Sequence, residues 1–103
     1  MAGTTQDMTA SSTASVAVAP GIAFSPADVT ILHGGTVTWT WSGGVSHSAT
    51  SGTCVSTTCT PNGTFDSTIK SSGTFQFSFP TAGDFPYYCM VHGSMMTAIV
   101  HVQ

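Results

Sequence analysis

The segment DFPYYCMVHGSMM, residues 84–96, carries a thiol, an imidazole and thioethers within a few positions of one another. Two residues separate Cys89 from His92, and two more separate His92 from Met95. Residues 85–89 alternate as a β-strand does, so two aromatic rings and the thiol share one face. The segment therefore predicts a strand that ends at Cys89 and is followed by a short loop rich in potential metal ligands.

The ligand types in this segment indicate copper. A thiolate, a neutral imidazole and a soft thioether together suit copper better than any other common biological metal. A trigonal copper site needs a second imidazole, and His47, in the segment 42–50 (SGGVSHSAT), is the best upstream candidate. Met96 competes with Met95 for the thioether position, and the spacing from His92 favours Met95.

Each of these residues also has an ordinary structural explanation. A single cysteine in a β-sandwich is more often a small buried hydrophobe, and a methionine beside a core usually fills space. The joint spacing of cysteine, histidine and methionine after an aromatic strand, with a histidine upstream, is what favours metal binding. His33, beside two glycines, and His101, between two valines, are expected to be surface residues rather than ligands.

Several segments resemble those of the cupredoxins, the small blue copper proteins of the plastocyanin and amicyanin type. They are residues 37–41 (VTWTW), 46–48 (SHS) and 82–89 (AGDFPYYC), together with His92 and Met95. The resemblance covers nearly the whole folded part of the chain. The closing loop is most similar to that of amicyanin, in which two residues separate the histidine from the methionine. The resemblance implies one copper ion per chain, cycling between Cu(I) and Cu(II), with four ligands: His47, Cys89, His92 and Met95.

The same resemblance bears on the residue after the first histidine. In the family this residue is often asparagine, whose side chain ties the two ligand loops together. Here it is Ser48, whose shorter side chain is expected to make fewer bonds. Its backbone N–H remains able to donate to the Cys89 sulfur, and such hydrogen bonds tune the reduction potential of a metal site.

The rest of the chain consists of short alternating segments separated by glycine and proline. No segment of ten residues has a helical period, and many short strands of this kind are typical of a β-sandwich. The expected strands are residues 14–18, 28–32, 36–41, 74–79, 85–89 and 98–102. Residues 33–35 are expected to form a turn, and residues 51–64 a long connection. The predicted fold class is all-β, and the resemblance implies a Greek-key β-sandwich with the copper site at one end.

A chain of 103 residues is long enough for one domain with one core. Residues 14–103 are expected to form that domain. Residues 1–13 are rich in Thr, Ser and Ala without any period, which predicts a flexible N-terminal tail. A poorly patterned first strand is the alternative for these residues.

The three cysteines divide into a pair, Cys54 and Cys59, and the separate Cys89. This pattern predicts one disulfide bond and one functional thiol. Disulfides persist in oxidising compartments, which favours an exported protein, periplasmic or otherwise extracytoplasmic. Residues 1–7 contain neither a charged leader nor an apolar run, so we expect that a signal peptide has been removed from this chain.

Only 5% of the residues are charged, and Lys70 is the single basic residue. Nucleic acids and anionic membrane surfaces both require clustered Lys or Arg, so the composition argues against these partners. No stretch of the sequence is apolar for long enough to cross a bilayer. The chain is therefore expected to be a monomer without membrane insertion.

These observations predict an electron-transfer protein that shuttles one electron through a mononuclear type 1 copper site. Redox partner proteins are expected to dock transiently around His92, as in the resembled proteins. Copper storage or delivery without redox turnover is the alternative. An enzyme is not expected, because a copper ion with four protein ligands has no open position for a substrate.

Overall fold

The structure is a computed structural model that describes residues 11–18 and 21–103. The strands are β1 (Ser11–Val18), β2 (Phe24–Ser25), β3 (Asp28–Trp41), β4 (Thr50–Val55), β5 (Thr58–Asp66), β6 (Gly73–Phe79), β7 (Gly83–Cys89) and β8 (Gly93–Val102). Strand β1 begins three residues before the expected start of the domain. Residues 1–10, the larger part of the expected tail, lie outside the described residues. Within the described ranges, no helix is long and apolar enough to cross a membrane.

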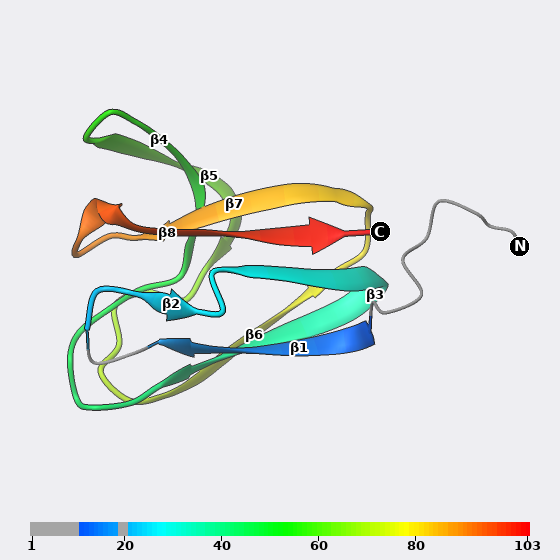
Figure 1. Ribbon diagram of the computed structural model, residues 1–103, viewed down its shortest axis with the longest axis horizontal. Helices are drawn as coiled ribbons and strands as arrows, with labels where there is room; N and C mark the ends of the chain where they lie inside the picture. Colours follow the sequence, from blue (N-terminus) through cyan, green and yellow to red (C-terminus); the bar gives the residue numbers. More distant parts are fainter. Residues whose placement is uncertain (1–10, 19–20) are drawn as a thin grey trace, which may run out of the picture.

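The strands form a β-sandwich, which confirms the predicted fold class (Figure 1). Pairing runs in the order β2-β1-β3-β8-β7-β4-β5, and β6 pairs with β3. Strand β3 pairs in parallel with both β1 and β8, whereas the other neighbours are antiparallel. The layer of β7 and β8 therefore lies over the layer of β1 and β6, and β3 belongs to both.

Strand β3 passes from one layer to the other without a turn. Residues 28–31 pair with β8, and residues 35–41 pair with β6. Between them Gly34 has a φ of 84°, a conformation that favours glycine. A Cβ on Gly35 would lie 2.6 Å from the carbonyl oxygen of Ser12 on β1, so a larger residue does not fit. The expected turn at residues 33–35 is therefore wrong, because the glycines instead bend one continuous strand.

The core is aromatic and centres on Trp39. The alternation predicted for residues 37–41 is confirmed, because Val37, Trp39 and Trp41 are all buried. The ring centroid of Trp39 lies 5.1 Å from that of Phe65 and 5.4 Å from that of Tyr87. Tyr87 is on β7, two residues before Cys89, so this packing supports the end of β7 that carries Cys89.

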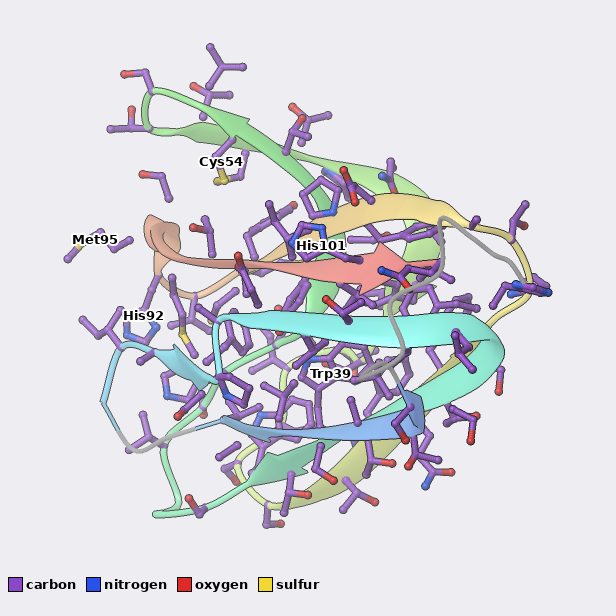
Figure 2. The ribbon with its side chains drawn as sticks, turned by 45° about the vertical axis from the view of Figure 1, so that its right-hand side comes forward. Trp39, Cys54, His92, Met95 and His101 are labelled. Carbon is purple, nitrogen blue, oxygen red and sulfur yellow. A yellow bond between two sulfur atoms is a disulfide. The ribbon has the colours of Figure 1, made fainter. Side chains whose placement is uncertain are left out.

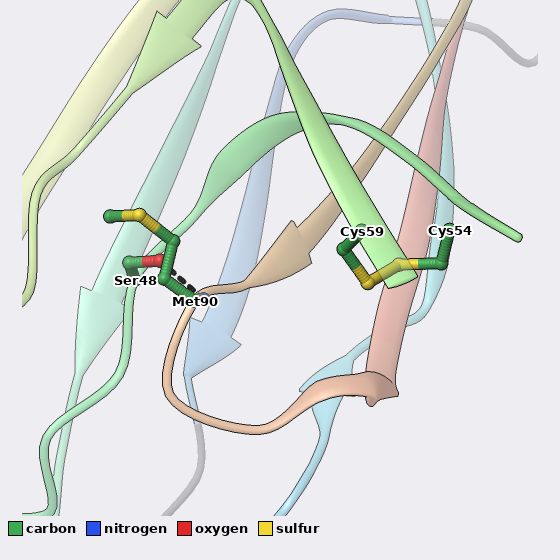
Figure 3. The surroundings of a disulfide bond; sticks show 4 residues. All are labelled: Ser48, Cys54, Cys59 and Met90. Carbon is green, nitrogen blue, oxygen red and sulfur yellow. Dashed lines mark hydrogen bonds between the residues drawn. A yellow bond between two sulfur atoms is a disulfide. The ribbon is translucent and has the colours of Figure 1, made fainter. Parts of the chain in front are cut away.

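Residues 50–66 form a β-hairpin, so the expected long connection at residues 51–64 is wrong. Cys54 and Cys59 lie directly opposite each other in the hairpin, and their predicted disulfide bond is present (Figure 3). Most side chains of β5 are exposed, and Phe65 is the residue of β5 that reaches the core. The disulfide holds together a hairpin that has little core of its own.

The outer face of the β7–β8 layer carries an ion-pair cluster. The Nδ1 atom of His101 is 2.8 Å from Asp84 Oδ1, and its Nε2 atom is 3.7 Å from Asp28 Oδ2. His101 is thus on the surface as expected, but it is held between two carboxylates. The hydrogen bond to Asp84 raises the pKa of His101 above its ordinary value, although partial burial opposes this shift.

This cluster predicts a pH-dependent contribution to stability. Because the pKa of His101 is raised on folding, its contribution is fully present below the unfolded pKa of 6.5 and is lost as the pH rises through the folded pKa. We expect His101→Gln to lower the free energy of unfolding relative to wild type at about pH 5 and to change it little at about pH 9. Urea unfolding of the metal-free protein measures this difference.

The matched control is His33→Gln. The Nδ1 atom of His33 contacts the carbonyl oxygen of Gln103, 2.9 Å away, rather than a carboxylate. We expect this variant to show no comparable difference between the two pH values. An equal loss of stability in His101→Gln at both pH values would contradict the prediction.

Candidate metal centre

Three potential ligands from two separate loops meet at one end of the sandwich. The ligand atoms of His47, Cys89 and His92 all lie within 4.8 Å of one another. The Nδ1 atoms of the two histidines are each 3.7 Å from the Cys89 sulfur. Within residues 11–18 and 21–103, this is the one such convergence of at least three His, Cys, Asp or Glu side chains.

Cys89 and His92 are placed by the connection between β7 and β8. Cys89 is the last residue of β7 and is fully buried, as the alternation of residues 85–89 predicts. The turn then closes tightly, because Cys89 pairs with Gly93 and the Met95 N–H donates to the His92 carbonyl oxygen. Gly93 has a φ of 60°, which glycine adopts without steric cost. His92, inside this turn, remains partly exposed.

His47 is held by its backbone. Its N–H donates to the Lys70 carbonyl oxygen, and its own carbonyl oxygen accepts from the Lys70 N–H, each over 2.9 Å. The same carbonyl oxygen accepts a hydrogen bond from Trp41 Nε1, also at 2.9 Å. The His47 side chain has no exposed surface. The backbone of His47 is therefore held by three hydrogen bonds, and its imidazole lies in the interior.

Ser48 joins the two ligand loops. Its backbone N–H donates to the Cys89 sulfur over 3.4 Å, which confirms the hydrogen bond expected from the sequence. Its hydroxyl oxygen also accepts a 2.9 Å hydrogen bond from the Met90 N–H, drawn as the dashed line in Figure 3. The serine thus ties the loop of His47 to the loop of Cys89 and His92, despite its short side chain.

The two methionines of the closing loop have opposite environments. The Met95 side chain is 72% exposed, and Figure 2 shows it extending outward from the end of the sandwich, away from His92. Met96 is 1% exposed and belongs to the same buried cluster as Cys89. The placement of Met95 does not fit the expected axial role, because a ligand must face the interior where the other three donors meet.

A signal for this difference is present in the sequence. Along β8, the buried residues alternate from Val102 back through Val100 and Ala98 to Met96. Extending that alternation towards the loop places Met96 on the inner face and Met95 on the outer one. The spacing argument considered only the distance from His92 and not the face of β8 on which each methionine lies.

The residues at this centre fit copper. A buried cysteine sulfur and two imidazole nitrogens already converge, and a buried thioether lies in the same cluster. This combination of one soft anionic sulfur and two borderline nitrogens, with a weak thioether, is the donor set of blue-copper sites. Hard oxygen ligands, which suit Mg²⁺ or Ca²⁺, are not members of the convergent group.

Comparisons with known proteins agree with this chemistry. The model of the family described as "Copper binding proteins, plastocyanin/azurin family" matches residues 10–103. A purple cupredoxin from Nitrosopumilus maritimus is similar in structure, with a TM-score of 0.73 and 26% identity; the alignment covers 87% of this chain and 99% of that one. A comparison with curated proteins found no significant match.

Two further solved structures show the fold alone. A mutant plastocyanin of fern has a TM-score of 0.69 and 22% identity, with 86% of this chain and 99% of that chain covered. The amicyanin of Paracoccus versutus has a TM-score of 0.64 and 19% identity, with 96% and 86% covered. The Greek-key sandwich implied by the sequence resemblance is therefore the observed fold.

Proposed function

Because this chain belongs to the plastocyanin/azurin family of copper-binding proteins, we propose that it is an electron carrier that exchanges one electron with partner proteins through a single copper site. The observation that supports this role best is the convergence of His47, Cys89 and His92, buried or partly buried at one end of a rigid sandwich. Loop ligands on a rigid scaffold keep their positions when the metal changes oxidation state.

We assign the ligands as His47, Cys89 and His92, with Met96 rather than Met95 as the axial thioether. Copper supplies a one-electron couple between Cu(I) and Cu(II) when it is bound by this set. The protein's own contribution is to hold the donors in place and to exclude water. The hydrogen bond from the Ser48 N–H would withdraw electron density from a copper-bound Cys89 sulfur and so favour the reduced state.

His92 is the residue through which an electron would enter and leave. Among the three clustered ligands, it is the one that reaches the surface, whereas His47 and Cys89 are fully buried. Apolar side chains in the same loop are exposed: Met90 by 41%, Val91 by 47% and Met95 by 72%. We call these three residues the loop patch, and we propose that partners dock on it. Met96 is buried and does not belong to the loop patch.

The remaining features of the proposal follow from composition and the disulfide. The Cys54–Cys59 bond supports an exported protein, because disulfides persist in oxidising compartments. The scarcity of basic residues supports partners other than nucleic acid. Four protein ligands leave no coordination position for a substrate, which supports electron transfer over catalysis.

Electron self-exchange between oxidised and reduced protein tests the proposal directly. Two molecules that meet through an uncharged loop patch should exchange electrons at a rate that depends little on salt, because few charges lie there to be screened. We expect Val91→Glu to slow this exchange at low salt by roughly tenfold, since it introduces repulsion between the two docking surfaces. NMR line broadening in partly oxidised samples measures the rate.

The matched control is Thr81→Glu. Thr81 is exposed in the turn between β6 and β7, at the end of the sandwich opposite the loop patch (Figure 1). The Thr81→Glu substitution adds the same charge away from the proposed docking surface, so we expect a self-exchange rate close to that of wild type. Equal slowing by both substitutions would refute docking on the loop patch. Loss of copper on each redox cycle would favour storage or delivery instead.

A further inference from the structure

A chain of buried hydroxyl groups leads from the ligand loops to a carboxylate on the neighbouring hairpin. The Ser48 hydroxyl lies 2.8 Å from that of Thr50, and the Thr50 hydroxyl donates to Asp66 Oδ1 over 3.1 Å. Ser48 and Thr50 are buried, whereas Asp66 is exposed. Thr50 and Asp66 face each other in the pairing of β4 with β5. We call Ser48, Thr50 and Asp66 the hydroxyl chain.

The direction of every hydrogen bond in this chain is determined. The Thr50 hydroxyl donates to Asp66 Oδ1, so its single proton points to the carboxyl group. Thr50 must then accept the single hydroxyl proton of Ser48. The Ser48 oxygen, which gives its own proton to Thr50, also accepts from the Met90 N–H at 2.9 Å. Hydrogen bonds aligned in this way polarise and strengthen one another.

We propose that Thr50 and Asp66 are positioning residues of the metal centre, which orient the Ser48 hydroxyl so that it anchors the loop of Cys89 and His92. Met90 directly follows Cys89, so an anchored Met90 N–H restrains the backbone beside the Cys89 sulfur. The same restraint keeps Ser48 in place, and its N–H donates to the Cys89 sulfur. The influence on a bound metal rests on the proposed ligand role of Cys89, whereas the anchoring of the loop does not.

The first test uses the metal-free protein. Thr50→Val keeps the shape of the side chain but removes the hydroxyl, and Thr50→Ser keeps the hydroxyl. We expect the Met90 amide to exchange with solvent roughly fivefold faster in Thr50→Val, the effect of weakening one hydrogen bond, and at nearly the wild-type rate in Thr50→Ser. NMR measures the exchange residue by residue. An unchanged rate at Met90 in Thr50→Val would overturn the proposal.

Asp66 offers a second pair of variants at an exposed position, where folding is less at risk. Asp66→Ala and Asp66→Asn remove the same charge, but the asparagine retains an oxygen that can accept from Thr50. We expect faster exchange at Met90 in Asp66→Ala and a nearly normal rate in Asp66→Asn. Equal effects of the two substitutions would mean that charge alone matters, which would refute a role for the hydroxyl chain.

The copper-loaded variants provide the second readout. If the hydroxyl chain positions Ser48, Thr50→Val should lengthen the hydrogen bond to the Cys89 sulfur, lower the reduction potential and shift the visible absorption, whereas Thr50→Ser should not. Faster exchange with an unchanged potential and spectrum would refute positioning of the metal centre. A wild-type protein that takes up no copper would refute the proposed function. The amide-exchange measurements would still decide whether the hydroxyl chain anchors the loop of Cys89 and His92.

Discussion

Cys89→Ser will abolish the intense visible absorption that the wild-type protein develops when Cu(II) is added. The absorption of a blue copper site arises from charge transfer between the thiolate sulfur and the metal, and a serine oxygen does not provide it. Cys89 is fully buried, and both histidine Nδ1 atoms lie 3.7 Å from its sulfur. The loss should therefore be essentially complete, even if His47 and His92 still retain some copper.

The double variant Cys54→Ser, Cys59→Ser is the control for this experiment. These two sulfurs are already bonded to each other across the β4–β5 hairpin, so they are not available as thiolate ligands. We expect the double variant to lose some stability but to keep the absorption. A Cys89→Ser protein that still turned intensely coloured, or a colourless wild type, would show that copper is not bound by the Cys89 thiolate.

Met96→Ala should cause the second large effect, on both stability and the metal site. Met96 is almost completely buried in the cluster that contains Cys89, so truncation removes core packing and leaves a cavity. Substitutions of this type lower the free energy of unfolding by about 2–5 kcal/mol. If the Met96 sulfur is the axial ligand, the visible spectrum and the reduction potential should change as well. Urea unfolding and spectroelectrochemistry measure the two effects.

Two further variants separate packing from ligation. Met96→Leu conserves volume, so it should cost less than about 1.5 kcal/mol while still removing the sulfur. Its spectrum should therefore change even though the protein remains stable. Met95→Ala alters an exposed side chain and should stay within about 0.5 kcal/mol of wild type, with an unchanged spectrum. A spectrum that responds to Met95→Ala but not to Met96→Leu would restore Met95 as the axial ligand.

The all-β class and much of the site could be predicted from the sequence because they depend on local patterns. Alternation along residues 37–41 and 85–89 is a period of two, which itself specifies the face of each side chain. The spacing between Cys89 and His92 is short enough for one loop, and the five-residue separation of Cys54 and Cys59 is short enough for a disulfide that closes one local loop. These features need no knowledge of distant parts of the chain.

Other features depended on how distant segments meet. The glycines at positions 34 and 35 are equally compatible with a turn and with a bent strand, and only the pairing of β3 with both layers decides between them. The threonine-rich residues 50–66 lack strong apolar alternation, so their pairing as a hairpin was not predicted. The ion pairs of His101 join β8 to carboxylates on two other strands, which no local pattern indicates.

The sequence by itself determined the ligand types, the strand that carries Cys89, the disulfide pair and the all-β class, because each follows from residue chemistry or from a period within one segment. The tertiary structure decided that β8 begins at Gly93 rather than at residue 98, so that the alternation along β8 reaches the closing loop and places Met96, not Met95, on the inner face. It also brought Ser48, Thr50 and Asp66 together, since hydrogen bonds between separate loops depend on the packing of the whole sandwich.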